Sequence, residues 1–150
     1  MLCALAVTLA GCTSEAPAAD EPSTAGAAPA VEVATVTDSQ QPAQDGLVRW
    51  TTAWRACFTA AAPDGTAVAG WESQVVTPEG VSPEVDDLPG GCLDLELATG
   101  VNAPEAGTPG RDAALATAQD LAYRVRSVHE DGTVSPWTNP VPAGSVRPAG

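Results

Sequence analysis

Tyr123-Arg-Val-Arg-Ser-Val-His-Glu-Asp-Gly-Thr-Val-Ser-Pro-Trp137 is the stretch that most directly indicates how this 150-residue chain folds. Residues 121–128 alternate apolar and polar side chains, which is the period of a half-buried β-strand. We expect this strand to end at the turn His129–Gly132 and to point Arg124 and Arg126 outward from one face. A short loop after the turn then brings Trp137 close to the neighbouring strand.

Four segments upstream have the same character. They are short, rich in β-branched or alternating residues, and separated by turn signals such as Asp45-Gly46. The expected strands are Val31–Thr37, Leu47–Trp50, Val68–Val76 and Cys92–Leu97. Fourteen Pro and fourteen Gly leave little room for helices, except at the Ala-rich run Arg111–Gln119, which fits either a turn of helix or the approach to a strand. The pattern predicts an all-β fold, a single antiparallel β-sandwich.

The stretch 121–138 resembles the end of a fibronectin type III domain. In that family the sixth strand follows Tyr-x-Val-Arg-Ala-x-Asn, a Gly-containing turn comes next, and Ser-Pro-Trp-Ser opens the last strand. Here Val125, Ser127 and His129 take the Val, Ala and Asn places, and Ser135-Pro-Trp-Thr138 matches the start of the last strand.

The resemblance extends upstream over residues 31–142. Val48-Arg-Trp50 resembles the second strand, whose Trp is the central core residue of the family, and Gly70-Trp-Glu72 resembles the third strand. In related cytokine-receptor domains a similar Trp stacks on outward arginines. The resemblance therefore implies a cation–π contact of Trp137 with Arg124 and Arg126. Another immunoglobulin-like sandwich is the alternative fold.

A second resemblance concerns the N-terminus. Residues 2–10 (LCALAVTLA) carry no charge, and as a helix they would rise only about 14 Å, too little to cross a bilayer core of about 30 Å. Leu9-Ala-Gly-Cys12 resembles a bacterial lipobox. The resemblance implies a signal peptide at 1–11, lipidation of Cys12 by a diacylglycerol, and an extracytoplasmic protein that is lipid-anchored to the bacterial cell membrane.

Residues 13–30 consist of Ala, Pro, Ser, Thr, Gly and acidic residues, without an aromatic residue or any Val, Ile or Leu. Such a segment buries too little apolar surface to offset its ordering entropy, so we expect a disordered tether with a mean span of about 23 Å. The expected organisation is a signal peptide (1–11), a lipidated Cys and disordered tether (12–30), and a fibronectin type III-like β-sandwich with a short C-terminal tail (31–150).

In an exported chain the two remaining cysteines, Cys57 and Cys92, are expected to form a disulfide. Closing a loop of about 36 residues stabilises a fold by about 4 kcal/mol in the chain-entropy model. The bond is expected to hold a long loop, 51–67, which carries Trp54, Arg55 and Phe58. Aromatic residues and Arg are favoured at interfaces, so these three are candidates for surface contact. The alternative is that the two aromatic residues cap one end of the sandwich.

The charge balance excludes some partners. Nineteen acidic residues against six Arg give a net charge of −13, the reverse of the basic footprint that nucleic acid requires. An anionic bilayer would repel such a body, so lipid must provide the membrane attachment. His129, the one histidine, is expected in a turn, which leaves too few ligands for zinc, and no calcium-loop motif occurs. We expect no metal and no cofactor.

No motif for catalysis occurs: there is no GxSxG, no phosphate loop and no HExxH. The sequence therefore predicts a non-catalytic surface lipoprotein for adhesion to, or recognition of, an envelope protein or glycan, with binding in the loops 51–67 and 98–112. One alternative is an envelope spacer or scaffold without a ligand. The other is a small extracytoplasmic hydrolase whose site carries no recognised motif. The fold alone does not decide among them.

Overall fold

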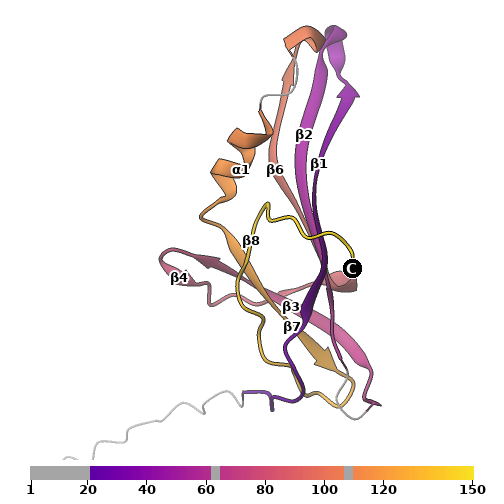
Figure 1. Ribbon diagram of the computed structural model, residues 1–150, viewed down its shortest axis with the longest axis vertical. Coiled ribbons are helices and arrows are strands. Elements are labelled where there is room, and N and C mark those ends of the chain that lie inside the picture. The colour runs from indigo at the N-terminus through magenta and orange to yellow at the C-terminus, as the bar shows by residue number, and fades with distance from the viewer. Residues whose placement is uncertain (1–20, 62–64, 107–109) are drawn as a thin grey trace, which may run out of the picture.

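The computed structural model describes residues 21–61, 65–106 and 110–150. It is an all-β fold of two antiparallel sheets, as predicted (Figure 1). The first sheet has the order β1-β2-β6, formed by Ala30–Pro42, Val48–Thr59 and Cys92–Asn102. The second has the order β4-β3-β7-β8, formed by Gly80–Val81, Val68–Thr77, Ala122–His129 and Val141–Pro142, and β5 (Asp86–Asp87) also pairs with β3.

All five predicted strands are present, but β1, β2 and β6 are longer than predicted. The segment 51–67 is not a long loop, because β2 continues to Thr59 and pairs with β1 and β6 along its length. Likewise β6 continues to Asn102, so only the later part of 98–112 connects strands. That part contains the 3-10 turn η4 (Pro104–Ala106) and leads to helix α1 (Arg111–Ala118), which confirms the helical alternative for the Ala-rich run.

The last strand begins later than the resemblance implies. Residues 135–140 run beside β7 without forming a regular ladder, and β8 covers only Val141–Pro142. Ser135 N–H and Thr138 N–H still donate to β7 carbonyls, those of Ser127 and Val125. Pro136 lies between the two donors and has no N–H of its own, so the ladder cannot be continuous there.

The three-stranded sheet extends past the second sheet as an arm, formed by the far ends of β1, β2 and β6 (Figure 1). Its end carries η4 and the 3-10 turn η1 (Gln44–Gly46). The two central residues of that turn, Asp45 and Gly46, have φ of 59° and 72°, as a tight turn between two strands requires. The Asp-Gly pair seen in the sequence is therefore the turn of the β1–β2 hairpin.

The core lies where the two sheets overlap, and Trp54 is at its centre with no exposed surface. Alternate residues of β2, including Ala56 and Phe58, face the same way and are buried with it. The second sheet contributes Val125, which is fully buried, and Tyr123, whose ring centroid lies 6.2 Å from that of Trp54.

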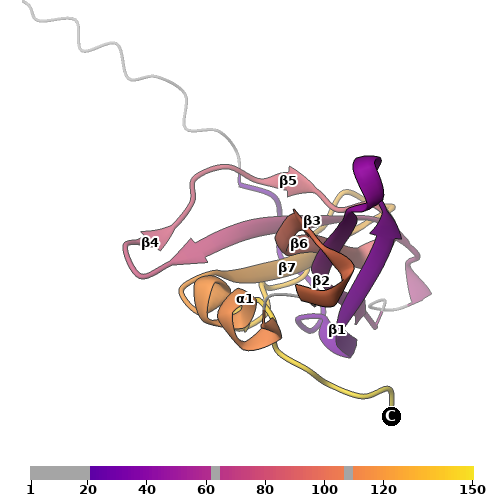
Figure 2. The same ribbon diagram turned by 90° about the horizontal axis from the view of Figure 1, so that it is seen from above.

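Trp50, the residue that the resemblance placed at the centre, is only half-buried and lies in the arm. A register shift after Thr52 places Ala98 and Gly100 of β6 opposite Thr52 and Trp50. A Cβ on Gly100 would overlap the Trp50 ring, so this glycine provides the space for the indole. Helix α1 covers the same face with small residues, chiefly Ala113 and Ala114, and takes the place of the second sheet there (Figure 2).

A C-terminal strap, residues 143–147, crosses from the second sheet to the first. It begins with buried Ala143, whose N–H donates to the carbonyl of Leu121. It ends at Arg147, which exchanges two 2.8 Å backbone hydrogen bonds with Ala34 on the outer edge of β1. The strap thereby closes one side of the sandwich between β7 and β1 (Figure 1).

The residues just before β1 are not a free tether, in contrast to the prediction. Val134 N–H donates to the Ser23 carbonyl, and Ala25 N–H donates to the Val134 carbonyl. Pro29 is buried. No apolar pattern in the sequence predicts this docking, because the contacts at Ser23–Ala25 are made by the backbone. The predicted signal peptide, Cys12 and residues 13–20 lie outside the described residues.

Candidate functional site

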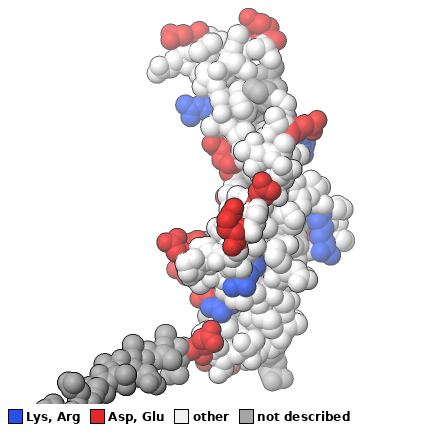
Figure 3. Space-filling view, turned by 90° about the vertical axis from the view of Figure 1, so that its left-hand side faces the viewer, with Lys and Arg blue, Asp and Glu red and all other residues white. Residues whose placement is uncertain are grey.

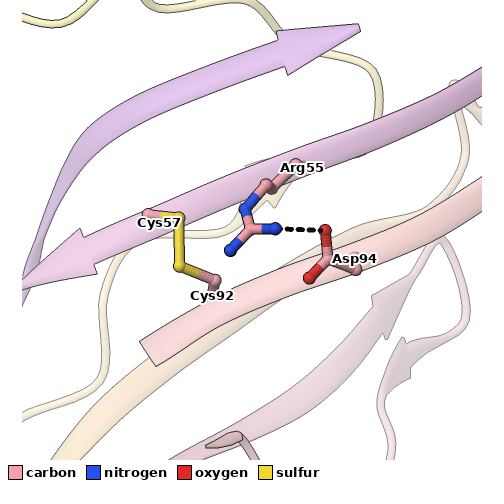
Figure 4. Close-up of a disulfide and its surroundings, with 4 residues drawn as sticks. All are labelled: Arg55, Cys57, Cys92 and Asp94. Atoms are coloured by element: carbon pink, nitrogen blue, oxygen red, sulfur yellow. Dashed lines mark ion pairs between the residues drawn. A yellow bond between two sulfur atoms is a disulfide. The ribbon is translucent and has the colours of Figure 1, made fainter. Parts of the chain in front are cut away.

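The predicted disulfide is confirmed: Cys57 and Cys92 are bonded, but in a different setting (Figure 4). The two cysteines are directly opposed in neighbouring strands, β2 and β6, and do not hold a long loop. Because Cys57 alternates with buried Ala56 and Phe58, the bond lies on the outer face of the sheet. It is an additional link between two strands that already pair by hydrogen bonds.

Trp54, Arg55 and Phe58 do not form the predicted contact surface. Trp54 is fully buried and Phe58 is 5% exposed, so neither ring is available to a partner. Both belong to the core where the sheets overlap, which is closer to the alternative that they cap one end of the sandwich. Arg55 alone points outward, and it forms an exposed ion pair with Asp94 at 3.4 Å (Figure 4).

The predicted stacking of Trp137 is confirmed. The guanidinium carbons of Arg124 and Arg126 lie 4.8 and 4.5 Å from the ring centroid. Each guanidinium is also held from the other side, since Arg126 Nε donates to Glu72 at 2.6 Å and Arg124 donates twice to the Gln74 side-chain oxygen. The five side chains form a continuous polar row on the outer face of the second sheet. Both arginines of this row already have polar and aromatic partners, so the row is a structural element of the second sheet.

His129 is not a turn residue, in contrast to the prediction. It is the last residue of β7 and is 2% exposed. The Thr133 hydroxyl donates to Asp131 at 2.8 Å, so it accepts from His129 Nδ1 at 3.0 Å. Nε2 lies 3.2 Å from the Ser127 hydroxyl, and in a neutral imidazole with its proton on Nδ1 it accepts from that hydroxyl. The backbone N–H of Thr133, followed by its hydroxyl, lowers the pKa of the Asp131 carboxyl.

This arrangement places a serine, a histidine and a carboxylate in one chain of hydrogen bonds. Ser127, however, has no exposed surface, so its hydroxyl has no path to a substrate carbonyl. Its backbone N–H is also held, by the Ser135 hydroxyl at 3.0 Å. These hydrogen bonds fix the turn after β7. Ser23–Ala25 pair with Val134, which directly follows that turn.

Within residues 21–61, 65–106 and 110–150 there is no cluster of three or more His, Cys, Asp or Glu side chains that would hold a metal ion. No helix in these ranges is long and apolar enough to span a bilayer. Acidic side chains occur along the whole length of the face seen in Figure 3, with fewer arginines between them.

Several surface hollows occur in the described part of the chain, and two of them lie at opposite places in the fold. One, of about 330 Å³, lies beside Trp71 at the start of β3, but Trp71 packs against the core and Gly91 lies against its ring. The other, of about 590 Å³, lies at the end of the arm around Leu47, Arg49 and Val101. Neither Leu47 nor Arg49 was predicted from the sequence as a site residue. The available signal was an apolar residue placed directly after the Asp45-Gly46 turn, where solvent exposure is expected.

No protein-family model, no curated protein and no solved structure matches this chain.

Proposed function

We propose that the protein is a non-catalytic, lipid-anchored surface protein that recognises an envelope protein or glycan through the end of its arm. In this proposal Cys12 carries the lipid, residues 13–20 form the tether, and the body is a fibronectin type III-like sandwich. The strand order supports that fold assignment, because a β1-β2-β6 sheet facing a β4-β3-β7-β8 sheet has the hairpin and crossover pattern of immunoglobulin-like sandwiches.

The relative position of the two ends of the molecule carries the proposal. Ser23–Ala25 are fixed to Val134 at the base, and the arm ends at the opposite pole of the long axis (Figure 1). A lipid attached upstream of residue 21 therefore leaves η1 and η4 at the end farther from the membrane. An elongated body that presents its hairpin ends outward is suited to contact with a partner.

Ser127 is buried, and the two arginines beside Trp137 already have partners. Both observations favour recognition over catalysis. A spacer without a ligand is the second candidate, and the acidic side chains along the molecule favour it, since they keep surfaces soluble and apart (Figure 3). The exposed apolar side chains Leu47 and Val101 at the far end favour recognition, because a spacer has no use for them.

Site-specific photocrosslinking in the producing cell distinguishes these candidates. A photoreactive amino acid is placed at Gln44, on the end of the arm, and in a matched variant at Glu130, at the base. Recognition predicts a discrete crosslinked species from the Gln44 position alone. A spacer predicts none, or the same diffuse pattern from both positions. Mass spectrometry of the mature N-terminus tests the anchor separately, and an unmodified Cys12 would overturn that part of the proposal.

A further inference from the structure

The far end of the arm carries a hollow with a specific chemical character, which we call the tip hollow. It has a volume of about 590 Å³ and combines apolar, amide and charged side chains. Its lining residues are Gln41, Pro42, Ala43, Gln44, Asp45, Leu47, Arg49 and Val101. Three strand ends and the hairpin turn contribute to it.

Strand register brings the polar and apolar groups of the tip hollow together. Gln41 of β1, Arg49 of β2 and Val101 of β6 are directly opposed across the sheet, in that order. Leu47 precedes Arg49 by two residues, which places both on the same face. Leu47 and Val101 are 39% and 48% exposed. Arg49 is therefore flanked by two solvent-exposed aliphatic side chains.

Arg49 differs from most arginines of the molecule. Arg55, Arg111 and Arg126 form ion pairs, and Arg124 is bonded to Gln74. In the described part of the chain, the Arg49 guanidinium has no such partner, although the chain carries a net charge of −13. A guanidinium offers paired donors that match the two oxygens of a carboxylate.

The tip hollow is held in shape by its surroundings. The Asp45-Gly46 turn is closed by a 3.2 Å hydrogen bond from Leu47 N–H to the Gln44 carbonyl. Below the hollow, the hydroxyls of Thr51 and Thr99 are linked at 3.2 Å between β2 and β6. A preformed site loses little conformational entropy when a ligand binds.

We infer that the tip hollow binds an extended protein segment in which one carboxylate side chain lies between aliphatic side chains on the same face. The inference rests on the proposed function and specifies its partner. The carboxylate pairs with Arg49, and the aliphatic groups pack on Leu47 and Val101. An anionic polysaccharide fits less well: the hollow is lined by no aromatic ring for a sugar to stack on, and Asp45 disfavours a second negative charge.

The test uses a defined peptide and the full chain, with Cys12→Ser to keep it free of lipid. Acetyl-Val-Ser-Glu-Ser-Val-amide presents one carboxylate between two valines on one face of an extended segment. It is titrated into the ¹⁵N-labelled protein and followed by the amide chemical shifts. The control peptide has Gln in place of Glu, and a trigalacturonate represents the anionic polysaccharide.

We expect the Glu peptide to shift the amides of Leu47, Arg49 and Val101, and the Gln peptide to bind about tenfold more weakly, as for the loss of one charge-assisted hydrogen bond. Arg49→Gln should cause the same loss. Arg147→Gln removes a second exposed arginine outside the hollow and should leave binding unchanged. Val101→Ser should also weaken binding and so test the apolar contact.

Three results would overturn the inference: equal binding of the Glu and Gln peptides, shifts located away from the tip hollow, or tighter binding of trigalacturonate than of the peptide. None of them affects the crosslinking result at Gln44. A crosslink there together with a failed peptide titration would leave the proposed function standing and remove only the partner chemistry. Peptide binding without a crosslink in cells would support the partner chemistry of the tip hollow and contradict the proposed function.

Discussion

The indole Nε1 of Trp54 donates a 2.8 Å hydrogen bond to the backbone carbonyl of Ser145, 91 residues away in the sequence. The bond joins the central residue of the core to the strap that closes the sandwich. It also satisfies the one polar atom of a side chain that has no exposed surface. The strap is therefore part of the core and not a disposable tail.

Replacing Trp54 should destabilise the protein far more than replacing Trp50. Trp54→Ala leaves a large cavity and an unpaired Ser145 carbonyl, so we expect a loss of about 3–5 kcal/mol in the free energy of unfolding. Trp54→Phe should cost less and keep the fold measurable. Trp50→Ala is the control, since that ring is half-buried in the arm. Urea denaturation followed by circular dichroism gives the comparison, and equal losses would contradict the assignment of Trp54 as the central residue.

The disulfide should contribute to stability through the unfolded state. The cysteines are 35 residues apart in the sequence, and the loop model gives about 4 kcal/mol for such a closure. We expect the double variant Cys57→Ala/Cys92→Ala to melt roughly 10 °C lower by calorimetry. Arg55→Gln breaks the neighbouring exposed ion pair and should change the melting temperature little. An unchanged melting temperature in the double variant would mean that the two strands need no covalent link.

The row around Trp137 should show a measurable pairwise energy. In a double-mutant cycle, Trp137→Ala and Arg126→Ala should be coupled by about 0.5–1 kcal/mol, because the guanidinium carbon lies 4.5 Å from the ring centroid. The same cycle with Arg55→Ala in place of Arg126→Ala serves as the control, since Arg55 pairs with Asp94 on the other sheet. Coupling of the same size in both cycles would argue against stacking.

Tyr123 is the sole tyrosine, so absorbance at 295 nm reports its ionisation alone. Burial, and secondly the charge of Asp86, raise its pKa above the ordinary value. The native protein should therefore titrate at a higher pH than the urea-unfolded chain, which titrates near pH 10. Asp86→Asn should lower the native midpoint. A native midpoint at or below the unfolded one would refute this account.

The same shift has a consequence for stability. Because the native pKa of Tyr123 is the higher one, the native state holds this proton more tightly than the unfolded state. The contribution of Tyr123 is therefore complete below about pH 10 and is lost as the pH rises through the native pKa. Denaturation curves should show a decline in stability that begins near pH 10 and is smaller in Tyr123→Phe.

Local patterns in the sequence predicted a large part of the fold. Alternation along Val68–Val76 and along residues 121–128 gave the strands β3 and β7 and the outward face that carries Arg124 and Arg126. The stacking of these arginines on Trp137 was implied by the family resemblance. The Cys57–Cys92 pairing followed from counting cysteines. These predictions held because each depends on the period of a strand or on a count, which neighbouring residues and the chain as a whole already contain.

The candidate site was predicted less well. Trp54 and Phe58 were placed on a loop because the strand was predicted to end at Trp50, although the next turn signal, Asp64-Gly65, comes only after them. The strand β2 continues to Thr59 and carries both rings into the core. His129 follows the strand pattern directly, but the Asp-Gly pair after it suggested an exposed turn. The tip hollow was missed because it requires β1, β2 and β6 to end at the same level, and that depends on register between distant segments.

The sequence by itself determined which residues share a face, since side chains alternate along every strand. Trp50 and Trp54 are four residues apart on β2, so the period of two places both on the inner face and cannot rank them. Only the tertiary structure decided that Trp54 lies at the centre, because the second sheet and the strap cover that half of the face. Over Trp50 the cover is α1, and beyond it the strands continue as an exposed arm. Burial along a face depends on where the opposing layer ends, and that boundary is set by contacts between residues far apart in the chain.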